Sequence, residues 1–531
     1  MIAVPPPSHI EVTVAASAHT GPLTGRLVVF IAKDSTPEPR LALSLRGPAV
    51  FGADMSGPTG VITDTSASYP KSLSALPPGD YYAQAVVNVY EQVHRSDGHT
   101  IWVHMNDGTV EFFNTAAGNL YGDVQRVHIG RGPIHLTVTH VMPGTPRPAD
   151  TEWLKHVRMQ SAMLTKFWGR PVYINATVLL PKGYAEHPDA HYPSVYALGH
   201  GTEPFGFTTD STDKERGPTE VRRGATIGKT SGLESGYDFY KAWTADAFPR
   251  VIAITLEQQT PYFPDSYSVN SANNGPYGDA IINEVMPYLE EHFRIVRQPY
   301  GRQIEGASTS GWQTLALALQ HPDAIGGAWV LQPDPIDFRH YQQTNIYDDT
   351  NAFVVQTGQF TIAERPFQRT VAGQVLWTAR DLSRFEDVLG SHGRSSYQLE
   401  AWEAVYGPVG PDGYPVPLWN KRTGTIDRTV AAYMRDHGFD LRDYAERNWS
   451  TLAPKLAGKL HFFAGDMDNY YLNLAVYDFE DLLQRKGAEV DFTYGRPEKG
   501  HGWHSFTWAE MVQKMAASIK ATGADPTPWN Y

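Results

Sequence analysis

A serine set among small residues lies in the stretch GRQIEGASTSGWQTLALALQ, which covers residues 301–320 of this 531-residue chain. Gly306, Ser308, Ser310 and Gly311 leave room for a strand to turn sharply into a closely packed helix, and such a turn can hold a serine up as a nucleophile. Plain packing between a strand and a helix requires the same small residues. The stretch alone therefore leaves both interpretations open.

Side chains that could activate this serine appear late in the chain. A serine hydroxyl needs a histidine base, and the histidine ring needs a carboxylate to orient it. Asp466 and Asp468 follow the apolar run LHFFAG, and His501 and His504 lie in GHGWHSFTW. Serine, acid and histidine in this order are typical of α/β-hydrolases. Turn or cap chemistry for the aspartates, and a structural role for the histidines, are the alternatives.

Cleavage through a serine also needs backbone N–H groups that stabilise the charge of the tetrahedral intermediate. One donor is normally the residue after the nucleophile, which is Thr309 here. The second comes from a loop after an early strand, and YALGHGTE supplies such a loop with His200, Gly201 and Thr202. An ordinary glycine turn is the alternative for this loop.

Two regions with different patterns must position these residues. Residues 8–142 consist of short β-branched and aromatic runs between Gly, Pro and Asp clusters, which favours an antiparallel β-sandwich-like domain over residues 1–142. A Pro-rich connector follows, and residues 143–164 are expected to form a linker. Over residues 165–531 strands alternate with helices, which predicts an α/β domain with a largely parallel sheet.

Seven strands are expected in the α/β domain, at residues 172–181, 193–201, 250–257, 302–306, 326–332, 459–466 and 489–495. The polar and aromatic segment at about 338–450 falls between two of them. It is predicted to be an insertion over the carboxyl edge of the sheet, where ligands of open α/β sheets bind. Its aromatic side chains would either stack on sugar or phenolic rings or pack the insertion onto the sheet.

Composition excludes several function classes. A formal net charge of −13 argues against a sequence-independent grip on nucleic acid or anionic lipid. The chain has no cysteine, so disulfides, thiolate metal sites and cysteine nucleophiles are excluded. No run approaches the ~20 apolar residues of a membrane span. We expect a soluble protein without nucleic-acid or membrane partners; the Pro-rich opening is compatible with a secreted or periplasmic protein whose leader was removed.

Metal binding is not expected either. Asp466, Asp468 and Asn469 lack the glycine and the terminal glutamate of an EF-hand loop. His501 and His504 are not part of an H-E-x-x-H helix. The sequence therefore predicts neither a catalytic metal nor another cofactor.

The same stretches resemble the putative-esterase family of α/β-hydrolases, which includes esterase D, feruloyl esterases, enterochelin esterase and the antigen 85 mycolyltransferases. The matching pieces are YALGHGTE, GASTSGW, GDMDN and GHGWHSFTW, and the resemblance covers roughly residues 165–520. It implies an α/β-hydrolase fold and a serine esterase that cleaves carboxylic esters through an acyl-enzyme. Feruloyl or other polysaccharide-linked esters, or small-molecule esters, are the substrates that the resemblance implies.

Transferred residue by residue, the family's roles predict a catalytic triad and an oxyanion hole, made of Ser308, Asp468, His501, Thr202 and Thr309. His501 is preferred to His504 because it stands two residues before Trp503, and Asp466 stays open as an alternative acid. Ser310 departs from the family, which has glycine there. Acyl transfer on the same triad, or carbohydrate binding without catalysis, are the alternative functions.

Overall fold

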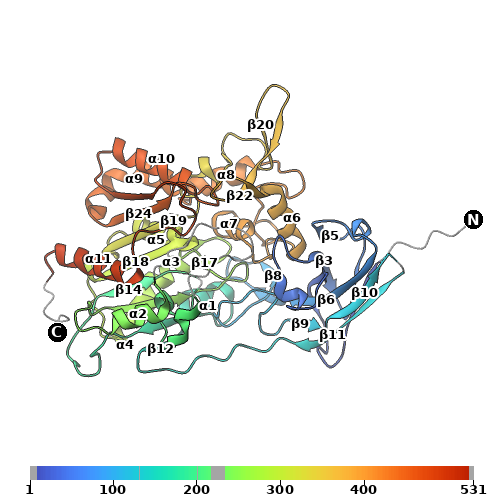
Figure 1. The fold of residues 1–531 in the computed structure, drawn as a ribbon, viewed down its shortest axis with the longest axis horizontal. Coiled ribbons are helices and arrows are strands. Elements are labelled where there is room, and N and C mark those ends of the chain that lie inside the picture. Colours follow the sequence, from blue (N-terminus) through green and yellow to red (C-terminus); the bar gives the residue numbers. More distant parts are fainter. Residues whose placement is uncertain (1–8, 131, 200, 217–233, 525–531) are drawn as a thin grey trace, which may run out of the picture.

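The computed structural model describes residues 9–130, 132–199, 201–216 and 234–524. A nine-stranded sheet is formed by the amino-terminal part of the chain, and an eight-stranded sheet flanked by helices is formed by the rest (Figure 1). A long insertion between two strands of the second sheet lies beside the first. The predicted fold class, an α/β-hydrolase with an amino-terminal β domain and an insertion, is confirmed.

The strands of the amino-terminal sheet are β1 (Ile10–Val14), β2 (Thr24–Ala32), β3 (Ala49–Ser56), β4 (Thr59–Ile62), β5 (Ala67–Tyr69), β6 (Gly79–Val89), β9 (Leu120–Gly122), β10 (Gln125–Ile129) and β11 (Ile134–Val141). Alternate residues of these strands meet in one buried cluster, so the sheet curves around its own core. Neighbouring strands are antiparallel except β1 and β11, which run parallel. The strands β7 (Glu91–His94) and β8 (Thr100–Val103) form a separate hairpin.

The opposite face of this sheet packs against the insertion, whose elements are β20 (Val354–Gln356), β21 (Ile362–Glu364), β22 (Pro366–Arg369), β23 (Val375–Thr378), α6 (Ala379–Leu389), α7 (Gln398–Tyr406), α8 (Arg428–Asp436) and α9 (Leu441–Leu456). Buried Arg26 on β2 donates hydrogen bonds to the carbonyl oxygens of Asp387 and Val388 at 2.8 and 2.9 Å. These carbonyls belong to the last turn of α6, where a cation is favoured by the helix dipole. Gly52 on β3 is required there, since a Cβ atom would lie 1.9 Å from the Val388 oxygen.

The second sheet has the order β12-β13-β15-β14-β18-β19-β24-β25. Its strands are β12 (Leu154–Gln160), β13 (Tyr173–Leu179), β14 (Ser194–Ala197), β15 (Ile252–Glu257), β18 (Arg302–Ser308), β19 (Gly327–Pro333), β24 (Leu460–Gly465) and β25 (Asp491–Gly495). All seven expected strands are present, and the pairs from β15 to β25 are parallel. The expected linker, residues 143–164, contains β12, which pairs with β13 along its whole length.

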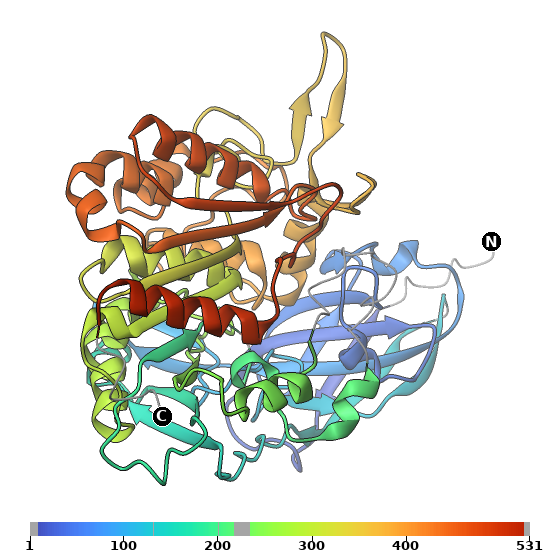
Figure 2. The same cartoon turned by 60° about the vertical axis from the view of Figure 1, so that its left-hand side comes forward.

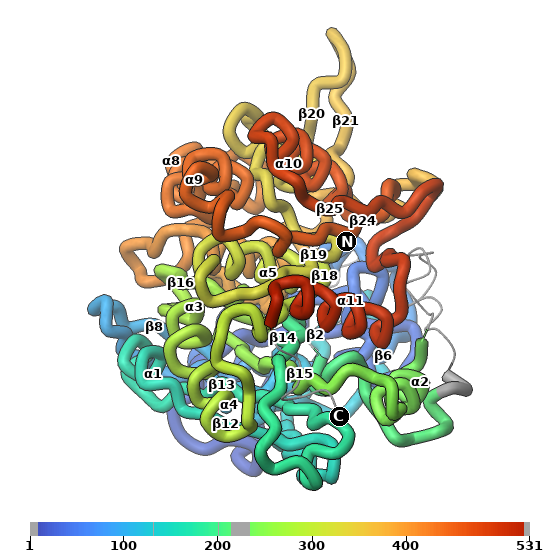
Figure 3. The backbone as a smooth tube through the Cα atoms, turned by 90° about the vertical axis from the view of Figure 1, so that its left-hand side faces the viewer, coloured from blue at the N-terminus to red at the C-terminus, as the bar shows by residue number. Residues whose placement is uncertain are grey.

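Helices cover both faces of this sheet, namely α1 (Ala162–Trp168), α2 (Gly236–Trp243), α3 (Tyr277–Ala280), the π-helical turn Ile281–Val285, α4 (Met286–His292), α5 (Thr309–Gln320), α10 (Asn473–Arg485) and α11 (Trp508–Ala521). Val195 and Ala253 pack with α2 and α11, whereas the adjacent Tyr196 and Ile254 belong to the cluster of α4 and α5. Figure 3 shows the helices α2 and α11 on one side of β14 and β15 and the helices α4 and α5 on the other. Figure 2 shows α11 in front of the sheet. Among the described helices, none has the length and apolarity to cross a membrane.

The effect of burial in this sheet on a carboxyl group can be tested at Glu305 on β18. It is buried, and burial raises the pKa of its carboxyl from 4.5 to about 8. The Glu305 carboxyl loses its proton at lower pH in the unfolded chain than in the folded chain. The free energy of unfolding should therefore fall as pH rises from about 4.5 to about 8. We expect Glu305→Gln, which cannot ionise, to lose this dependence and to exceed the parent in stability at about pH 8. Urea unfolding of both proteins across this range is the measurement. Equal slopes against pH would contradict a neutral Glu305.

Candidate active site

The turn at Ser308 joins the end of β18 to the first residue of α5. Ser308 has φ 60° and ψ −120°, a conformation that residues with a side chain rarely adopt. The serine therefore stands at a strained strand-to-helix turn, as its sequence context predicts. Its hydroxyl lines a cavity and donates a hydrogen bond to Asp334 Oδ1 at 3.2 Å.

Small residues allow the strands and helix to approach each other at this turn. A Cβ atom on Gly306 would lie 2.4 Å from the Ser310 oxygen, and one on Gly311 would lie 2.5 Å from the oxygen of Leu331 on β19. Ser310 fits where a glycine was expected because its hydroxyl turns back and donates to the Ala307 oxygen at 2.9 Å. The departure from the family pattern is thus accommodated locally.

The loops after β24 and β25 bring an aspartate and a histidine together. His501 Nδ1 lies 2.8 Å from Asp468 Oδ2, and the side chain of Asp468 is fully buried. The other oxygen of Asp468 accepts the backbone N–H groups of Tyr470 at 2.8 Å and Leu472 at 3.3 Å. These bonds fix the carboxylate, and the carboxylate in turn orients the imidazole that lines the cavity with Ser308.

Asp466 and His504, the alternative acid and histidine, make other contacts. Asp466 accepts the backbone N–H of Lys499 at 2.9 Å and so closes the loop that carries His501. His504 is buried outside the residues lining this cavity, and its Nδ1 lies 2.6 Å from the Phe506 oxygen. Burial lowers the pKa of His504 to about 4. Of the two aspartates between which the sequence leaves the choice open, Asp468 contacts His501, whereas Asp466 bonds the loop.

The charge balance around His501 favours its protonated form. Burial alone would lower the pKa of the imidazole, but the charge of Asp468, its hydrogen bond and the charge of Asp334 together raise it above 6.5. A carboxylate paired with an imidazole in this way can hold the ring in one tautomer. It also stabilises the imidazolium that forms when the ring takes a proton.

The two residues expected to form an oxyanion hole are placed differently. Thr309 begins α5, so its backbone N–H belongs to the first helical turn, whose donors have no acceptor within the helix. Thr202 lies beside Glu257 and Asn175 in a second cavity and does not line the one at Ser308. Its role stays a prediction, and His200 lies outside the described residues.

Three parts of the chain bound the cavity at Ser308, which has a volume of about 840 Å³. The insertion contributes aromatic side chains, namely Phe367, Trp377, Tyr397 and Trp402. The amino-terminal sheet domain contributes the segment after its 3-10 turn Pro39–Ala42, including Leu43, Leu45 and Arg46. The first domain therefore forms part of the wall of the site.

Asp334 and Tyr267 are the site residues that sequence reasoning missed. Asp334 directly follows β19, and the Tyr267 hydroxyl donates to it at 2.8 Å. Tyr267 lies in the stretch DSYSVNSANNGPYGD, in which Asp265 accepts a bond from Gln313 and Asn273 donates to backbone oxygens of α7 and Gly407. These neighbours hold the stretch in place, and none of them lines the cavity.

Within the part of the chain that the structure describes, no three His, Asp or Glu side chains are grouped as a metal ion requires. The expectation that no metal takes part stays a prediction.

Part of the chain matches a known protein family. Residues 171–387 match the family described as putative esterase. This match supports esterase activity for the α/β-hydrolase region. The match includes Ser308 and Thr309, whereas Asp468 and His501 lie beyond its end. No curated protein matches the chain.

Solved structures similar to the chain include several esterases. A ferulic acid esterase is 14% identical with a TM-score of 0.38, covering 69% of this chain and 97% of its own. The S-formylglutathione hydrolase FrmB of Staphylococcus aureus is 15% identical with a TM-score of 0.33, covering 69% and 98%. MPT51 of Mycobacterium tuberculosis is 12% identical with a TM-score of 0.35, covering 69% and 98%. All three TM-scores are low, so the similarity to esterases rests on the family match.

The wall contributed by the amino-terminal domain can be tested with Leu43. We expect Leu43→Asp to raise KM for aryl esters several-fold, because a carboxylate in this apolar wall is costly to desolvate when a ring covers it. Acetyl esters, which fill less of the cavity, should be affected less. Steady-state kinetics on phenylpropionyl and acetyl p-nitrophenyl esters is the measurement.

Val61→Asp is the matched control, since Val61 is exposed on the same domain and does not line the cavity. An equal loss for both esters in Leu43→Asp would show that this wall does not contact the substrate.

Proposed function

We propose that the protein hydrolyses carboxylic esters through an acyl-enzyme on Ser308, with His501 as the base and Asp468 as the residue that orients it. One observation carries this proposal. Ser308 at its strained turn and His501 bonded to a buried aspartate line the same cavity. A serine nucleophile needs both neighbours within one site.

In the proposed reaction Ser308 Oγ attacks the ester carbonyl carbon while His501 Nε2 takes the hydroxyl proton. The carbonyl oxygen becomes an oxyanion near the first turn of α5, where the Thr309 N–H can donate to it. The intermediate collapses, the alcohol leaves with the proton from His501, and Ser308 is left acylated. Water then attacks the acyl-enzyme with His501 again as the base, which releases the acid and restores Ser308.

We further propose that the substrate carries an aromatic ring on its acid or alcohol part, as feruloyl and related esters do. Phe367, Trp377, Tyr397 and Trp402 bound the cavity from the insertion and supply faces and edges on which a ring can stack. Their number supports the interpretation that the insertion binds substrate, although several of these rings also pack within the core.

Covalent labelling tests the nucleophile. We expect a fluorophosphonate to add one adduct at Ser308, and Ser308→Ala to lose both the adduct and at least about a thousandfold of turnover, because the triad acts as a unit. Intact-mass and peptide mapping identify the site, and p-nitrophenyl esters report turnover. Ser310→Ala, in the same turn, should still be labelled.

Unlabelled parent protein without ester turnover would overturn the proposed function. Products that retain an added alcohol in place of water would assign the same triad to acyl transfer instead of hydrolysis.

The pH profile tests the assignment of His501. The base must be neutral to accept a proton, so kcat/KM should rise with pH through the pKa of His501, which lies above 6.5. Asp468→Asn removes the larger of the two charges that raise this pKa. We expect the acidic limb to move to lower pH, while the maximum rate falls by roughly 10⁴-fold as in other triads that lose their acid.

Asp466→Asn is the control, because Asp466 bonds the loop and not the imidazole. If the acidic limb of the pH profile moves in Asp466→Asn and stays in place in Asp468→Asn, Asp466 and not Asp468 is the residue that orients His501.

A further inference from the structure

A second buried carboxylate, Asp334, faces the serine in the cavity. It lies at the carboxyl end of β19 with 3% of its surface exposed. Its Oδ1 accepts the Ser308 hydroxyl at 3.2 Å, and its backbone N–H donates to the Ser308 oxygen at 3.0 Å. The mechanism described above gives this group no role, since His501 already has Asp468.

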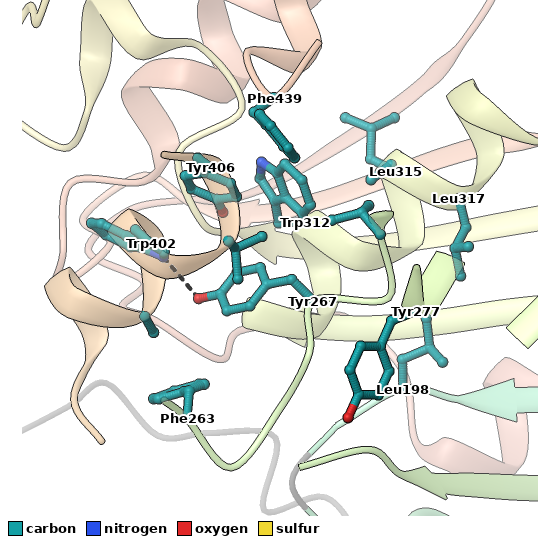
Figure 4. Packing of buried hydrophobic residues seen from close by; sticks show 14 of the residues in the cluster. Leu198, Phe263, Tyr267, Tyr277, Trp312, Leu315, Leu317, Trp402, Tyr406 and Phe439 are labelled. Atoms are coloured by element: carbon teal, nitrogen blue, oxygen red, sulfur yellow. Dashed lines mark hydrogen bonds between the residues drawn. The ribbon is translucent and has the colours of Figure 1, made fainter. Parts of the chain in front are cut away.

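The other carboxylate oxygen is held by four donors. Asp334 Oδ2 accepts hydrogen bonds at 2.8 to 3.2 Å from the side chains of Tyr267, Thr309, Gln398 and Trp402. Tyr267 and Trp402 also bond to each other at 2.7 Å and point toward one another in Figure 4. The clamp fixes the carboxylate in one orientation, so Oδ1 is directed at Ser308 and the cavity.

Among the described residues, no lysine or arginine forms an ion pair with Asp334. Burial raises its pKa, and the bonds from Tyr267 and Trp402 and the charge of His501 act in the opposite direction. The net pKa of Asp334 is raised above its usual 3.8, and the four donors on Oδ2 offset part of the cost of removing the carboxylate from water.

The acyl-enzyme leaves Asp334 Oδ1 without its donor. Once Ser308 Oγ is acylated it has no hydrogen, so the buried Oδ1 loses the bond that it has in the free protein. An unpaired buried carboxylate oxygen is costly. A donor on the substrate would restore the bond, and a substituent on the carbon next to the ester carbonyl is only a few bonds from Oγ and can reach Oδ1.

We propose that Asp334 is a specificity-determining residue that accepts a hydrogen bond from an amino or hydroxyl group on the α-carbon of the acyl part of the substrate. This inference rests on the proposed function at Ser308 and names the substrate class more closely. Sites that hydrogen-bond a substrate group reject analogues without it far more strongly than apolar pockets reject a missing methylene.

Matched benzyl esters test this inference. They share the alcohol and differ only at the α-carbon: 3-phenylpropionyl without a donor, 3-phenyllactoyl with a hydroxyl and phenylalanyl with an amine. We expect kcat/KM for at least one donor ester to exceed that of the donor-free ester by about 100-fold. In Asp334→Asn, which keeps an acceptor for the clamp but turns an amide toward Ser308, this ratio should fall at least tenfold.

The ratio between esters separates this role from a structural one, because damage to the fold or to the triad lowers all three rates together. Asp323→Asn is the control variant, since Asp323 is an exposed carboxylate paired with Lys455, and it should keep the ratio of the parent. If the parent prefers the phenylalanyl ester alone and loses this preference when the amine is deprotonated, the substrate forms an ion pair with Asp334. If it prefers the amine and hydroxyl esters equally, the substrate donates a neutral hydrogen bond. Both outcomes support the inference.

Failure of this inference differs from failure of the proposed function. If the parent hydrolyses the donor-free ester as fast as both donor esters, or if Asp334→Asn lowers all three rates by the same factor, the role of Asp334 is overturned and the esterase remains. If fluorophosphonate does not label Ser308 and none of the esters reacts, the proposed function itself fails.

Discussion

The close approach of β18, α5 and β19 is the constraint on which the site depends. Without a Cβ atom, Gly311 lets α5 lie against the oxygen of Leu331, so the helix starts directly over the end of β19. This approach forces the backbone of Ser308 into a positive φ and brings Asp334 within hydrogen-bond distance of its hydroxyl. The strain at Ser308 is offset by the packing of a helix whose apolar side chains are buried.

A second level of organisation comes from the insertion, which links the two sheets. Its helix α6 receives Arg26 from the first sheet at its carboxyl end, and α7 supplies Gln398 and Trp402 to the clamp on Asp334. The same insertion therefore fixes the first domain against the cavity and fixes the carboxylate inside it. A shift of the first domain would be transmitted to the wall at Leu43 and, through α6 and α7, to the site.

Local sequence patterns predicted the elements of the esterase domain because buried parallel strands are nearly continuous apolar runs. Strand β12 escaped prediction since its sequence, LKHVRMQ, is polar on one face and follows a Pro-rich connector. The neighbours of the serine could be expected from their order, but the contact of Asp468 with His501 depends on how two loops close. Asp334 gave no local signal, since its partners Tyr267 and Trp402 are 67 and 68 residues away.

Asp334 has two opposite effects on the proposed reaction. When His501 takes the serine proton it becomes a cation, and the charges of Asp468 and Asp334 both stabilise it. The oxyanion that forms at the same time is negative. Asp334 Oδ1 lies 3.2 Å from Ser308 Oγ, so an ionised Asp334 opposes that step. A donor on the substrate placed against Oδ1 would reduce this repulsion while leaving the attraction for the imidazolium largely intact. The acidic group beside the nucleophile is therefore compatible with catalysis when the substrate itself helps to neutralise it.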